Sequence, residues 1–212
     1  MRPVPSDLLD FIDRHSFFYV IGHKEPDGDC VGSQLALASF LRRTGKSATV
    51  LSAGPFTRTE IMAYENRFSP IAPPELPHDR AAALILDCSS LQRIGAVRDT
   101  LPSVPIAFID HHAAGSAVGE VVYIDDRAPS VTAMILLLIE AMGQSPTKEE
   151  AELLLFGLAT DSGFFRHLDE GSSETFLASS RLVSAGASPK KVFHMMYGGK
   201  SLISRKLMGE IL

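Results

Sequence analysis

The sequence predicts an α/β fold, in which a doubly wound, mainly parallel sheet of five strands is flanked by helices and followed by a helical C-terminal linker region. Short apolar runs alternate with segments of helical periodicity, which is the pattern of parallel strands joined by crossover helices. Glycine, proline or clustered polar residues separate these segments. Hydrophobic residues make up 45% of the 212 residues and charged residues 21%, an ordinary composition for a globular domain.

The first half of the chain is expected to begin the sheet. Ser6 is expected to cap the first helix, because a serine hydroxyl accepts hydrogen bonds from the free N–H groups of a first turn. Gly45 is expected to end the second helix. The elements expected here are a helix at 5–15, a strand at 17–22, a helix at 31–45, a strand at 47–54 and a proline-rich loop at 69–77.

The second half completes the sheet and then becomes helical. Thr147 and Glu150 have the spacing of a capping box, and Ser130 is placed as the N-cap of the preceding helix. The elements expected here are strands within 81–90, 104–112 and 120–126, and helices at 130–143, 147–160 and 172–186.

Charge and composition exclude several classes of partner. The formal charge is −5 and no run of Lys and Arg exceeds two residues, so we expect neither duplex DNA nor an anionic membrane surface as a partner. The longest apolar stretch, at 133–142, is too short for a transmembrane helix and contains Glu140. Two cysteines without a signal peptide make a disulfide framework unexpected and predict a cytoplasmic location.

Acidic and histidine residues gather after the predicted strands. Ligands of open α/β sheets bind beyond the carboxyl ends of the strands, so these side chains are expected at one rim. Carboxylate and imidazole ligands without a thiolate suit a hard or borderline divalent ion such as Mn²⁺. The residues in question are His23, Asp27, Asp29, Asp87, Asp110, His111, His112 and Asp161.

The charge of this group predicts two cations. Asp27, Asp29, Asp87 and Asp161 would together carry a charge of −4, which two divalent ions would cancel. Metal pairs ~4 Å apart clamp a phosphoryl group and activate a bridging water. The sequence therefore predicts phosphoester hydrolysis.

Four segments, "HKEPDGDCVGS", "LILDCSS", "IDHH" and "ATDSGFF", resemble the four motifs of the DHH phosphoesterases, in the same order. The resemblance extends over essentially the whole chain. The form P-D-G-D-x-x-G-S is similar to the branch of nanoRNases and 3′-phosphoadenosine-5′-phosphate (pAp) phosphatases, which also contains linear and cyclic dinucleotide phosphodiesterases.

This resemblance implies a role for each motif residue. Two Mn²⁺ per chain are implied, with Mg²⁺ or Co²⁺ as alternatives, and a hydroxide bridging them would be the nucleophile. His112 would face the scissile phosphate, and Asp110 would orient a ligand histidine. The implied metal ligands are His23 and Asp27 for one ion, Asp29, His111 and Asp161 for the other, and Asp87 bridging both.

The resemblance leaves three functions open. The first is hydrolysis of short oligoribonucleotides, linear dinucleotides such as pApA, or pAp, with short single-stranded RNA or nucleotides as partners. The second is the activity of family II inorganic pyrophosphatases, which usually carry Thr and Ser where this chain has Gly28 and Cys30. The third, suggested by the abrupt C-terminus of the sequence, is a nucleotide-binding or scaffolding module without turnover. Members of the family often form homodimers, so a homodimer is implied.

One feature of the family has no match here. Members of the nanoRNase branch carry a second, DHH-associated domain with a glycine-rich GGGH-type segment, and "YGGKS" at 197–201 lacks its histidine. Apolar residues at helical spacing in 202–212 end without a cap, which favours continuation of the natural chain. We therefore expect a catalytic DHH domain at 1–186, a helical linker at 187–212, and the second domain outside this chain.

Four further residues have alternative interpretations. Arg166 is a candidate phosphate clamp or an exposed arginine beside a helix, and Ser33 is a helix cap or a substrate or ligand contact. Cys30 and Cys88 each follow a proposed ligand and are expected to pack behind the metals rather than to bind zinc.

Asp29→Asn is expected to cost little in folding, because the aspartates repel one another without metal.

Overall fold

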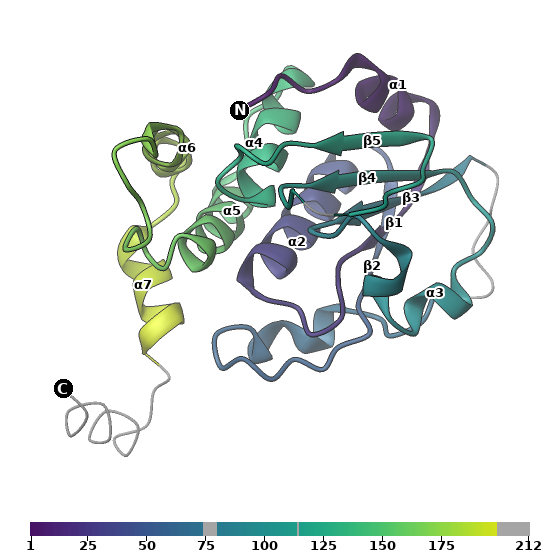
Figure 1. The fold of residues 1–212 in the computed structure, drawn as a ribbon, viewed down its shortest axis with the longest axis horizontal. Coiled ribbons are helices and arrows are strands. Elements are labelled where there is room, and N and C mark those ends of the chain that lie inside the picture. The colour runs from purple at the N-terminus through teal and green to yellow at the C-terminus, as the bar shows by residue number, and fades with distance from the viewer. Residues whose placement is uncertain (74–79, 114, 199–212) are drawn as a thin grey trace.

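A computed structural model describes residues 1–73, 80–113 and 115–198, and Figure 1 shows their arrangement around one five-stranded sheet. The strand order is β2-β1-β3-β4-β5, and every neighbouring pair is parallel. This confirms the predicted α/β class and the parallel sheet. The strands are β1 (Phe17–Ile21), β2 (Ser47–Leu51), β3 (Ala81–Leu86), β4 (Ile106–Asp110) and β5 (Val121–Ile124).

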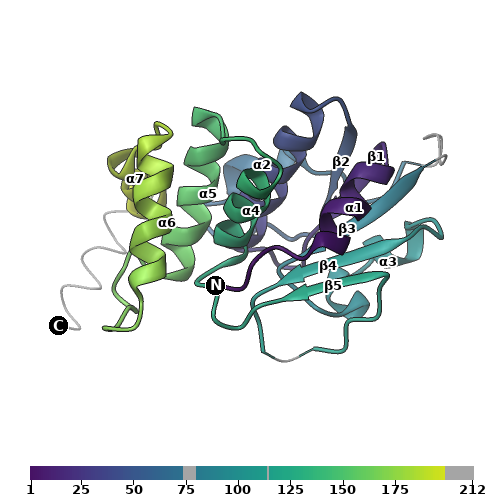
Figure 2. The ribbon, with the colours of Figure 1, turned by 90° about the horizontal axis from the view of Figure 1, so that it is seen from above.

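Helices cover both faces of the sheet. Figure 2 shows the larger helical layer on one side and the short α3 on the other. The helices are α1 (Ser6–Arg14), α2 (Gly28–Arg43), α3 (Val97–Thr100), α4 (Val131–Ala141), α5 (Lys148–Asp161), α6 (Ser173–Ser184) and α7 (Pro189–Tyr197), with 3₁₀ turns at Met62–Arg67 and Leu91–Ile94.

The two faces of the sheet form two hydrophobic clusters. Phe18 and Val20 of β1 pack into the larger cluster with α1, α2, α4 and α5, whereas Tyr19 and Ile21 pack into the smaller one beside α3. Because both faces are covered, the central strands are continuous apolar runs rather than alternating ones.

Glycines allow α2 and α5 to approach closely at the end where the motifs lie. A Cβ atom added at Gly32 would lie 2.6 Å from the carbonyl oxygen of Leu153, and one added at Gly28 would lie 2.4 Å from the side chain of Thr160. The first turn of α2 is thereby fixed beside the last turn of α5. This contact places the "DGD" motif next to Asp161.

Several predicted helix ends need correction. Ser6 is the first residue of α1, and its N-cap is Pro5, which has no side-chain hydrogen bond. The second helix begins at Gly28 rather than at 31, because the side chain of Asp27 accepts a hydrogen bond from the Cys30 N–H and caps it. Ser33 lies inside this helix, where its hydroxyl donates to the carbonyl of Cys30, so it is not a cap.

Two predicted caps are confirmed. Thr147 and Glu150 form both hydrogen bonds of a capping box at the start of α5. The hydroxyl of Ser130 accepts a hydrogen bond from the N–H of Ala133 and caps α4.

The C-terminal prediction is only partly covered by the structure. The helix α7 lies in the predicted linker at 187–212, but the apolar stripe at 202–212 lies outside the described residues. In the part of the chain that the structure describes, every helix is too short or too polar to cross a bilayer.

Candidate metal centre

The motif residues meet at the carboxyl ends of three neighbouring strands. His23 lies two positions after β1, Asp87 follows β3 directly, and Asp110 is the last residue of β4. Because β1, β3 and β4 are adjacent in the sheet, their following residues share one rim. The remaining aspartates come from the helical layer: Asp27 and Asp29 from the start of α2, and Asp161 from the end of α5.

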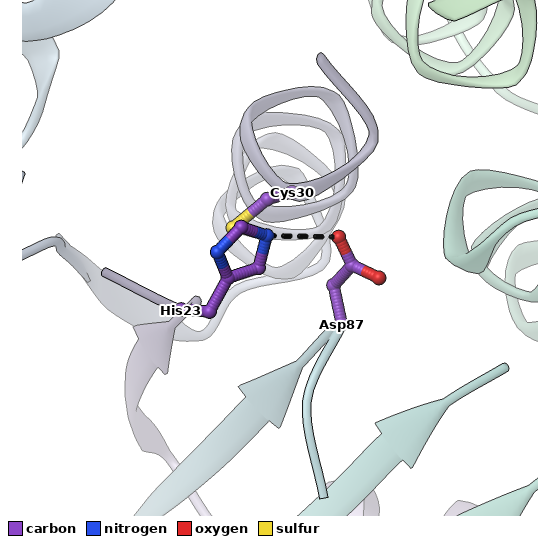
Figure 3. Close-up of side chains that lie close together, drawn as sticks. All are labelled: His23, Cys30 and Asp87. Atoms are coloured by element: carbon purple, nitrogen blue, oxygen red, sulfur yellow. Dashed lines mark ion pairs between the residues drawn. The ribbon is translucent and has the colours of Figure 1, made fainter. Parts of the chain in front are cut away.

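His23 lies between two carboxylates. Its Nε2 atom is 3.4 Å from Oδ2 of Asp87 and 3.9 Å from Oδ2 of Asp27. Its Nδ1 atom lies 2.8 Å from the carbonyl oxygen of Lys24. Because a carbonyl oxygen only accepts hydrogen bonds, Nδ1 carries the proton in this contact. In the neutral ring the lone pair of Nε2 then faces the two carboxylates. Figure 3 shows His23 and Asp87 turned toward each other, with Cys30 beside them.

His111 has the same arrangement on the other side of Asp87. Its Nε2 atom is 3.3 Å from Oδ2 of Asp161, 3.6 Å from Oδ1 of Asp87 and 4.0 Å from Oδ2 of Asp29. Its Nδ1 atom lies 3.3 Å from the carbonyl oxygen of Ala128. Imidazoles held by a backbone carbonyl at one nitrogen and facing carboxylates at the other are typical of metal ligands.

Asp87 occupies the centre of the group. Its side chain is 2% exposed, its Oδ2 atom faces His23, and its Oδ1 atom lies near His111 and His112. Oδ1 is buried and has no hydrogen-bond donor among the described residues. The backbone at Asp87 has a φ of 59°, a conformation that costs free energy in non-glycine residues and is concentrated at functional sites. A divalent cation on each side of the carboxylate would satisfy both oxygens, so the residues fit two ions.

The carboxylates raise one another's pKa. Burial, followed by the charges of Asp29 and Asp27, raises the pKa of Asp87 well above its usual value. The same causes raise the pKa of Asp161 to about 8. Without cations the rim therefore holds protons that Asp residues in water would have released.

Asp29 has a structural contact that the sequence did not predict. Its Oδ2 atom accepts a hydrogen bond from the N–H of Val131 (2.7 Å), and its Oδ1 atom accepts from the N–H and the hydroxyl of Thr132 (2.9 and 2.7 Å). Burial raises the pKa of Asp29, although these bonds and His111 oppose the rise. The carboxylate thus ties the start of α4 to α2, and the expectation that Asp29→Asn costs little in folding is no longer justified.

Asp110 orients His112 rather than His111. Its Oδ1 atom lies 2.8 Å from Nδ1 of His112 and accepts the backbone N–H of the same residue at 3.2 Å. Burial opposes the ionised form, but the hydrogen bonds from His112 dominate and lower the pKa of Asp110. The bond to Asp110 in turn raises the pKa of His112, whose side chain is 51% exposed. The prediction that Asp110 orients a ligand histidine therefore needs correction, because Asp110 holds the histidine that was expected to face the substrate.

Both cysteines remain thiols beside the centre. Burial, with the charges of Asp87 and Asp27, raises the pKa of Cys30 well above its usual value, and burial with Asp87 raises the pKa of Cys88 to about 12. The sulfur of Cys30 donates a weak hydrogen bond to Oε1 of Gln34 at 3.5 Å. Potential ligand atoms of Cys30, His23 and Asp87 lie within 4.8 Å of one another, so the prediction that the cysteines pack behind the metals without binding one stays a prediction.

An arginine that the sequence did not predict lies at this rim, and the role of Arg166 as a phosphate clamp stays a prediction. Arg58, in the loop after β2, has a guanidinium nitrogen 3.9 Å from Oδ2 of Asp27, and its charge opposes the rise in the pKa of Asp161. Nε of Arg166 donates to the carbonyl of Gly163 at 3.0 Å, and among the described residues no carboxylate pairs with Arg166. The only feature of the sequence that could have indicated Arg58 is its position after β2, the strand beside β1.

Comparisons with known proteins agree with the family that the motifs at this rim resemble. The family model described as "DHH family, N-terminal domain" matches residues 17–158, more than half of the chain. The chain is 31% identical over 149 residues to a Thermus thermophilus protein named "Bifunctional oligoribonuclease and PAP phosphatase NrnA", covering 70% of this chain and 44% of that protein. It is 25% identical over 196 residues to "Manganese-dependent inorganic pyrophosphatase" of Methanothrix thermoacetophila, covering 92% of this chain and 63% of that protein.

A solved structure shares the fold. An exopolyphosphatase-related protein from Bacteroides fragilis superimposes with a TM-score of 0.82 at 24% identity, covering 97% of this chain and 63% of that one. The chain thus spans about half to two thirds of the length of the proteins that it matches. The family match over the sheet and the first three motifs leads to one conclusion: this chain belongs to the DHH family of phosphoesterases.

Proposed function

We propose that the chain is the catalytic domain of a phosphoesterase that uses two divalent cations, Mn²⁺ first among them, to hydrolyse short oligoribonucleotides, linear dinucleotides such as pApA, or pAp. The observation that carries the proposal is the Asp87 carboxylate, which is buried between two imidazoles with one oxygen lacking any donor among the described residues. A buried oxygen without a partner is costly in a folded protein unless a cation or water satisfies it.

Two ligand groups share Asp87. His23 and Asp27 would hold one cation with it, and Asp29, His111 and Asp161 would hold the other. When bound, the cations would supply Lewis-acid stabilisation of the phosphoryl oxygens and a water of lowered pKa.

Side chains of the protein would supply a proton and a positive charge around the two cations. Asp110 fixes Nδ1 of His112, which leaves Nε2 of this exposed ring to hydrogen-bond a phosphate oxygen or the leaving group. Arg58 would exchange its contact with Asp27 for a phosphate oxygen once a cation neutralises that carboxylate.

The choice of substrate is supported by the relatives. The Thermus thermophilus protein is named for oligoribonuclease and PAP phosphatase activities, and it is the one of the two relatives described above with the higher identity. Short single-stranded RNA or nucleotides would be the partners, in the cytoplasm, and a homodimer is part of the proposal through the family resemblance.

Inorganic pyrophosphatase is the second candidate. The Methanothrix thermoacetophila relative, named for that activity, aligns with 92% of the chain. Against it, Gly28 and Cys30 stand where that family usually carries Thr and Ser. A substrate panel of pyrophosphate, pAp, pApA and a three-residue RNA separates the two activities.

The experiment combines Mn²⁺ titration with that panel in the parent protein, Asp87→Asn and Asp99→Asn. Asp99 is an exposed aspartate of α3 paired with Arg98, so its variant controls for the loss of one carboxylate. We expect the parent and Asp99→Asn to bind Mn²⁺ and release mononucleotide, and Asp87→Asn to bind Mn²⁺ at least about 100-fold more weakly and to release none. Full activity in Asp87→Asn would refute the proposal, and Mn²⁺ binding without hydrolysis of any substrate would identify a binding module instead.

A further inference from the structure

A cavity of about 340 Å³ opens beside the metal centre, between the loops that follow β3 and β4. It includes Asp110 and His112, so it is continuous with the proposed reaction site. Its volume is at the lower end of that of small-molecule sites. The other residues that line it are Cys88, Ser89, Ser90, Arg93, Ala113 and Gly115.

The wall of this cavity is closely packed. The N–H of Ser116 donates to the carbonyl of Ser89 at 3.1 Å, which ties the loop after β4 to the loop after β3. A Cβ atom at Gly115 would lie 1.6 Å from the hydroxyl oxygen of Ser89, so only glycine allows the two loops to meet this closely. The cavity is therefore a defined part of the rim.

Arg93 supplies a positive charge that the folded chain leaves uncompensated. Its side chain is exposed, and among the described residues no carboxylate or carbonyl accepts a hydrogen bond from its guanidinium. By contrast, Arg14, Arg43 and Arg181 each pair with a glutamate. The one carboxylate that lines the cavity is Asp110, whose Oδ1 atom is hydrogen-bonded to His112 and whose buried Oδ2 atom has no hydrogen-bond partner among the described residues.

A second cation lies next to Arg93. The N–H of Lys24 donates to the carbonyl of Arg93 at 2.7 Å, and the Lys24 side chain passes Gly95, where an added Cβ atom would lie 3.3 Å from it. No carboxylate pairs with Lys24 within the described ranges. Two basic residues without a carboxylate partner among the described residues are therefore neighbours along the backbone in this part of the rim.

The cavity on the opposite side has the opposite character. It has a volume of about 540 Å³ and includes Asp161 of the metal centre. Its lining also contains Asp126, Asp169 and Glu174, whereas its one arginine, Arg127, is paired with Asp125. An anionic extension of the substrate would be repelled there and attracted to the Arg93 side.

We infer that the 340 Å³ cavity is a second-phosphate site, in which Arg93 binds a phosphate of the substrate other than the one that reacts. This inference rests on the proposed function and narrows its substrate class to molecules that carry at least two phosphate groups about one nucleoside apart. A guanidinium suits this role because it donates two parallel hydrogen bonds to phosphate oxygens. Arg93 is thus a specificity-determining residue for the second phosphate.

The kinetic test uses substrates that differ only by that phosphate: pApA against ApA. Charge-assisted hydrogen bonds contribute about 1.5–3 kcal/mol, so kcat/KM of Arg93→Ala should fall roughly 10- to 150-fold for pApA and less than about threefold for ApA. Arg93→Lys should recover part of the loss, since it keeps the charge. Arg98→Ala, which removes an exposed arginine of the neighbouring α3, should match the parent on both substrates.

A binding test separates this inference from the proposed function. Inorganic phosphate is titrated calorimetrically into chelator-treated parent, Arg93→Ala and Arg98→Ala, and only Arg93→Ala should lose binding by tenfold or more. If the parent hydrolyses no phosphoester, the proposed function fails and this arm still decides the inference. Equal losses of kcat/KM on pApA and ApA, no loss on either, or unchanged phosphate binding by Arg93→Ala would overturn it.

Discussion

Asp87 combines three features that rarely occur together in one residue. It is buried, it has a positive φ, and its pKa is raised well above its usual value by burial and by three neighbouring aspartates, Asp29, Asp27 and Asp161. Each of these features costs free energy in the metal-free protein. The residue that would bind both cations is therefore one that destabilises the chain in their absence.

Asp87→Asn should separate these contributions. Asparagine tolerates a positive φ and keeps the shape of the side chain while removing the buried charge. We expect the metal-free variant to be at least as stable as the parent near pH 8, and its affinity for Mn²⁺ to fall by at least about 100-fold. Thermal unfolding in chelator and calorimetric titration of Mn²⁺ check the two effects.

Asp87→Ala is the comparison that isolates the backbone conformation. Alanine in a left-handed conformation costs roughly 1–2 kcal/mol, so this variant should unfold more easily than Asp87→Asn although both lack the charge. An Asp87→Asn variant that bound Mn²⁺ as tightly as the parent would contradict the bridging role.

Asp29→Asn should destabilise the protein even without metal. An amide group presents an NH₂ where the carboxylate accepts hydrogen bonds, so at least one of the donors at Val131 and Thr132 would lose its acceptor. Hydrogen bonds to a charged group contribute about 1.5–3 kcal/mol each, and the free energy of unfolding should fall by that order.

Urea unfolding in chelator measures this effect, with Thr132→Val as the control. That variant removes the hydroxyl donor to Asp29 and leaves both backbone donors in place, so its loss should be smaller. Stability equal to the parent in Asp29→Asn would show that the repulsion among the aspartates outweighs the hydrogen bonds to α4.

The residues of the metal centre differ in how readily the sequence predicts them. The six proposed ligands, His112 and Asp110 follow strands or lie at helix ends within recognisable motifs, and the structure brings them to one rim. Arg58 and Arg93 lie in irregular segments where nothing in the local pattern indicates which way a side chain points. Similarly, the hydrogen bonds from the start of α4 to Asp29 join residues about a hundred positions apart, and a contact of this kind leaves no repeating pattern in the sequence.

At the scale of elements, the packing of α2 on α5 depends on small residues. Gly32→Ala gains helix propensity worth about 1 kcal/mol, but its methyl group would lie 2.6 Å from the Leu153 carbonyl oxygen. Overpacking costs about 1–3 kcal/mol, and movement of α2 would displace Asp29. We therefore expect a lower melting temperature and weaker Mn²⁺ binding in Gly32→Ala.

Ser180→Ala in α6 is the matched control for helix propensity. Ser180 is exposed, so the substitution should leave Mn²⁺ binding unchanged and alter stability by no more than about 0.5 kcal/mol. A melting temperature of Gly32→Ala at or above that of the parent would mean that α2 and α5 can move apart without a loss of stability.

Helix starts were the least predictable feature of the elements. Apolar periodicity begins at Val31, whereas α2 begins at Gly28, because its first turn carries the polar proposed ligand Asp29 and is capped by Asp27. The starts of α4 and α5 were predictable, because Ser130 and Thr147 are followed directly by the helical pattern. Polar residues in the first turn thus conceal the start of the helix from a search for apolar periodicity.

At the scale of the whole molecule, the crowded carboxylates should make stability depend on pH and metal. Raised pKa values of Asp161, Asp87 and Asp29 mean that the folded state binds more protons than the unfolded state above about pH 4. Stability should therefore fall as pH rises from about 4 through about 8. The raised pKa of His112 acts in the same direction.

Thermal unfolding between about pH 6 and pH 8.5, in chelator and in Mn²⁺, checks this dependence. The melting temperature in chelator should fall with pH, and the gain from Mn²⁺ should grow with pH, because the cation displaces the protons that are still bound at low pH. A melting temperature in chelator that rises with pH would refute the proposed coupling among the carboxylates.

The sheet was the most predictable part of the molecule. Each of its strands falls within an apolar run bounded by turn residues, and crossover helices require parallel neighbours. The two 3₁₀ turns were not predicted, because Met62–Arg67 and Leu91–Ile94 are too short for a periodic pattern. The domain boundary near 186 stays a prediction.

The contact between Asp29 and α4 limits how this carboxylate can coordinate. Oδ1 already accepts two hydrogen bonds, whereas Oδ2 accepts one and lies 4.0 Å from Nε2 of His111. Only Oδ2 has a lone pair left over, so this is the oxygen with which Asp29 would hold a cation while keeping its three protein donors. The geometry of one cation would then be set by the position of a helix end instead of by a freely rotating side chain.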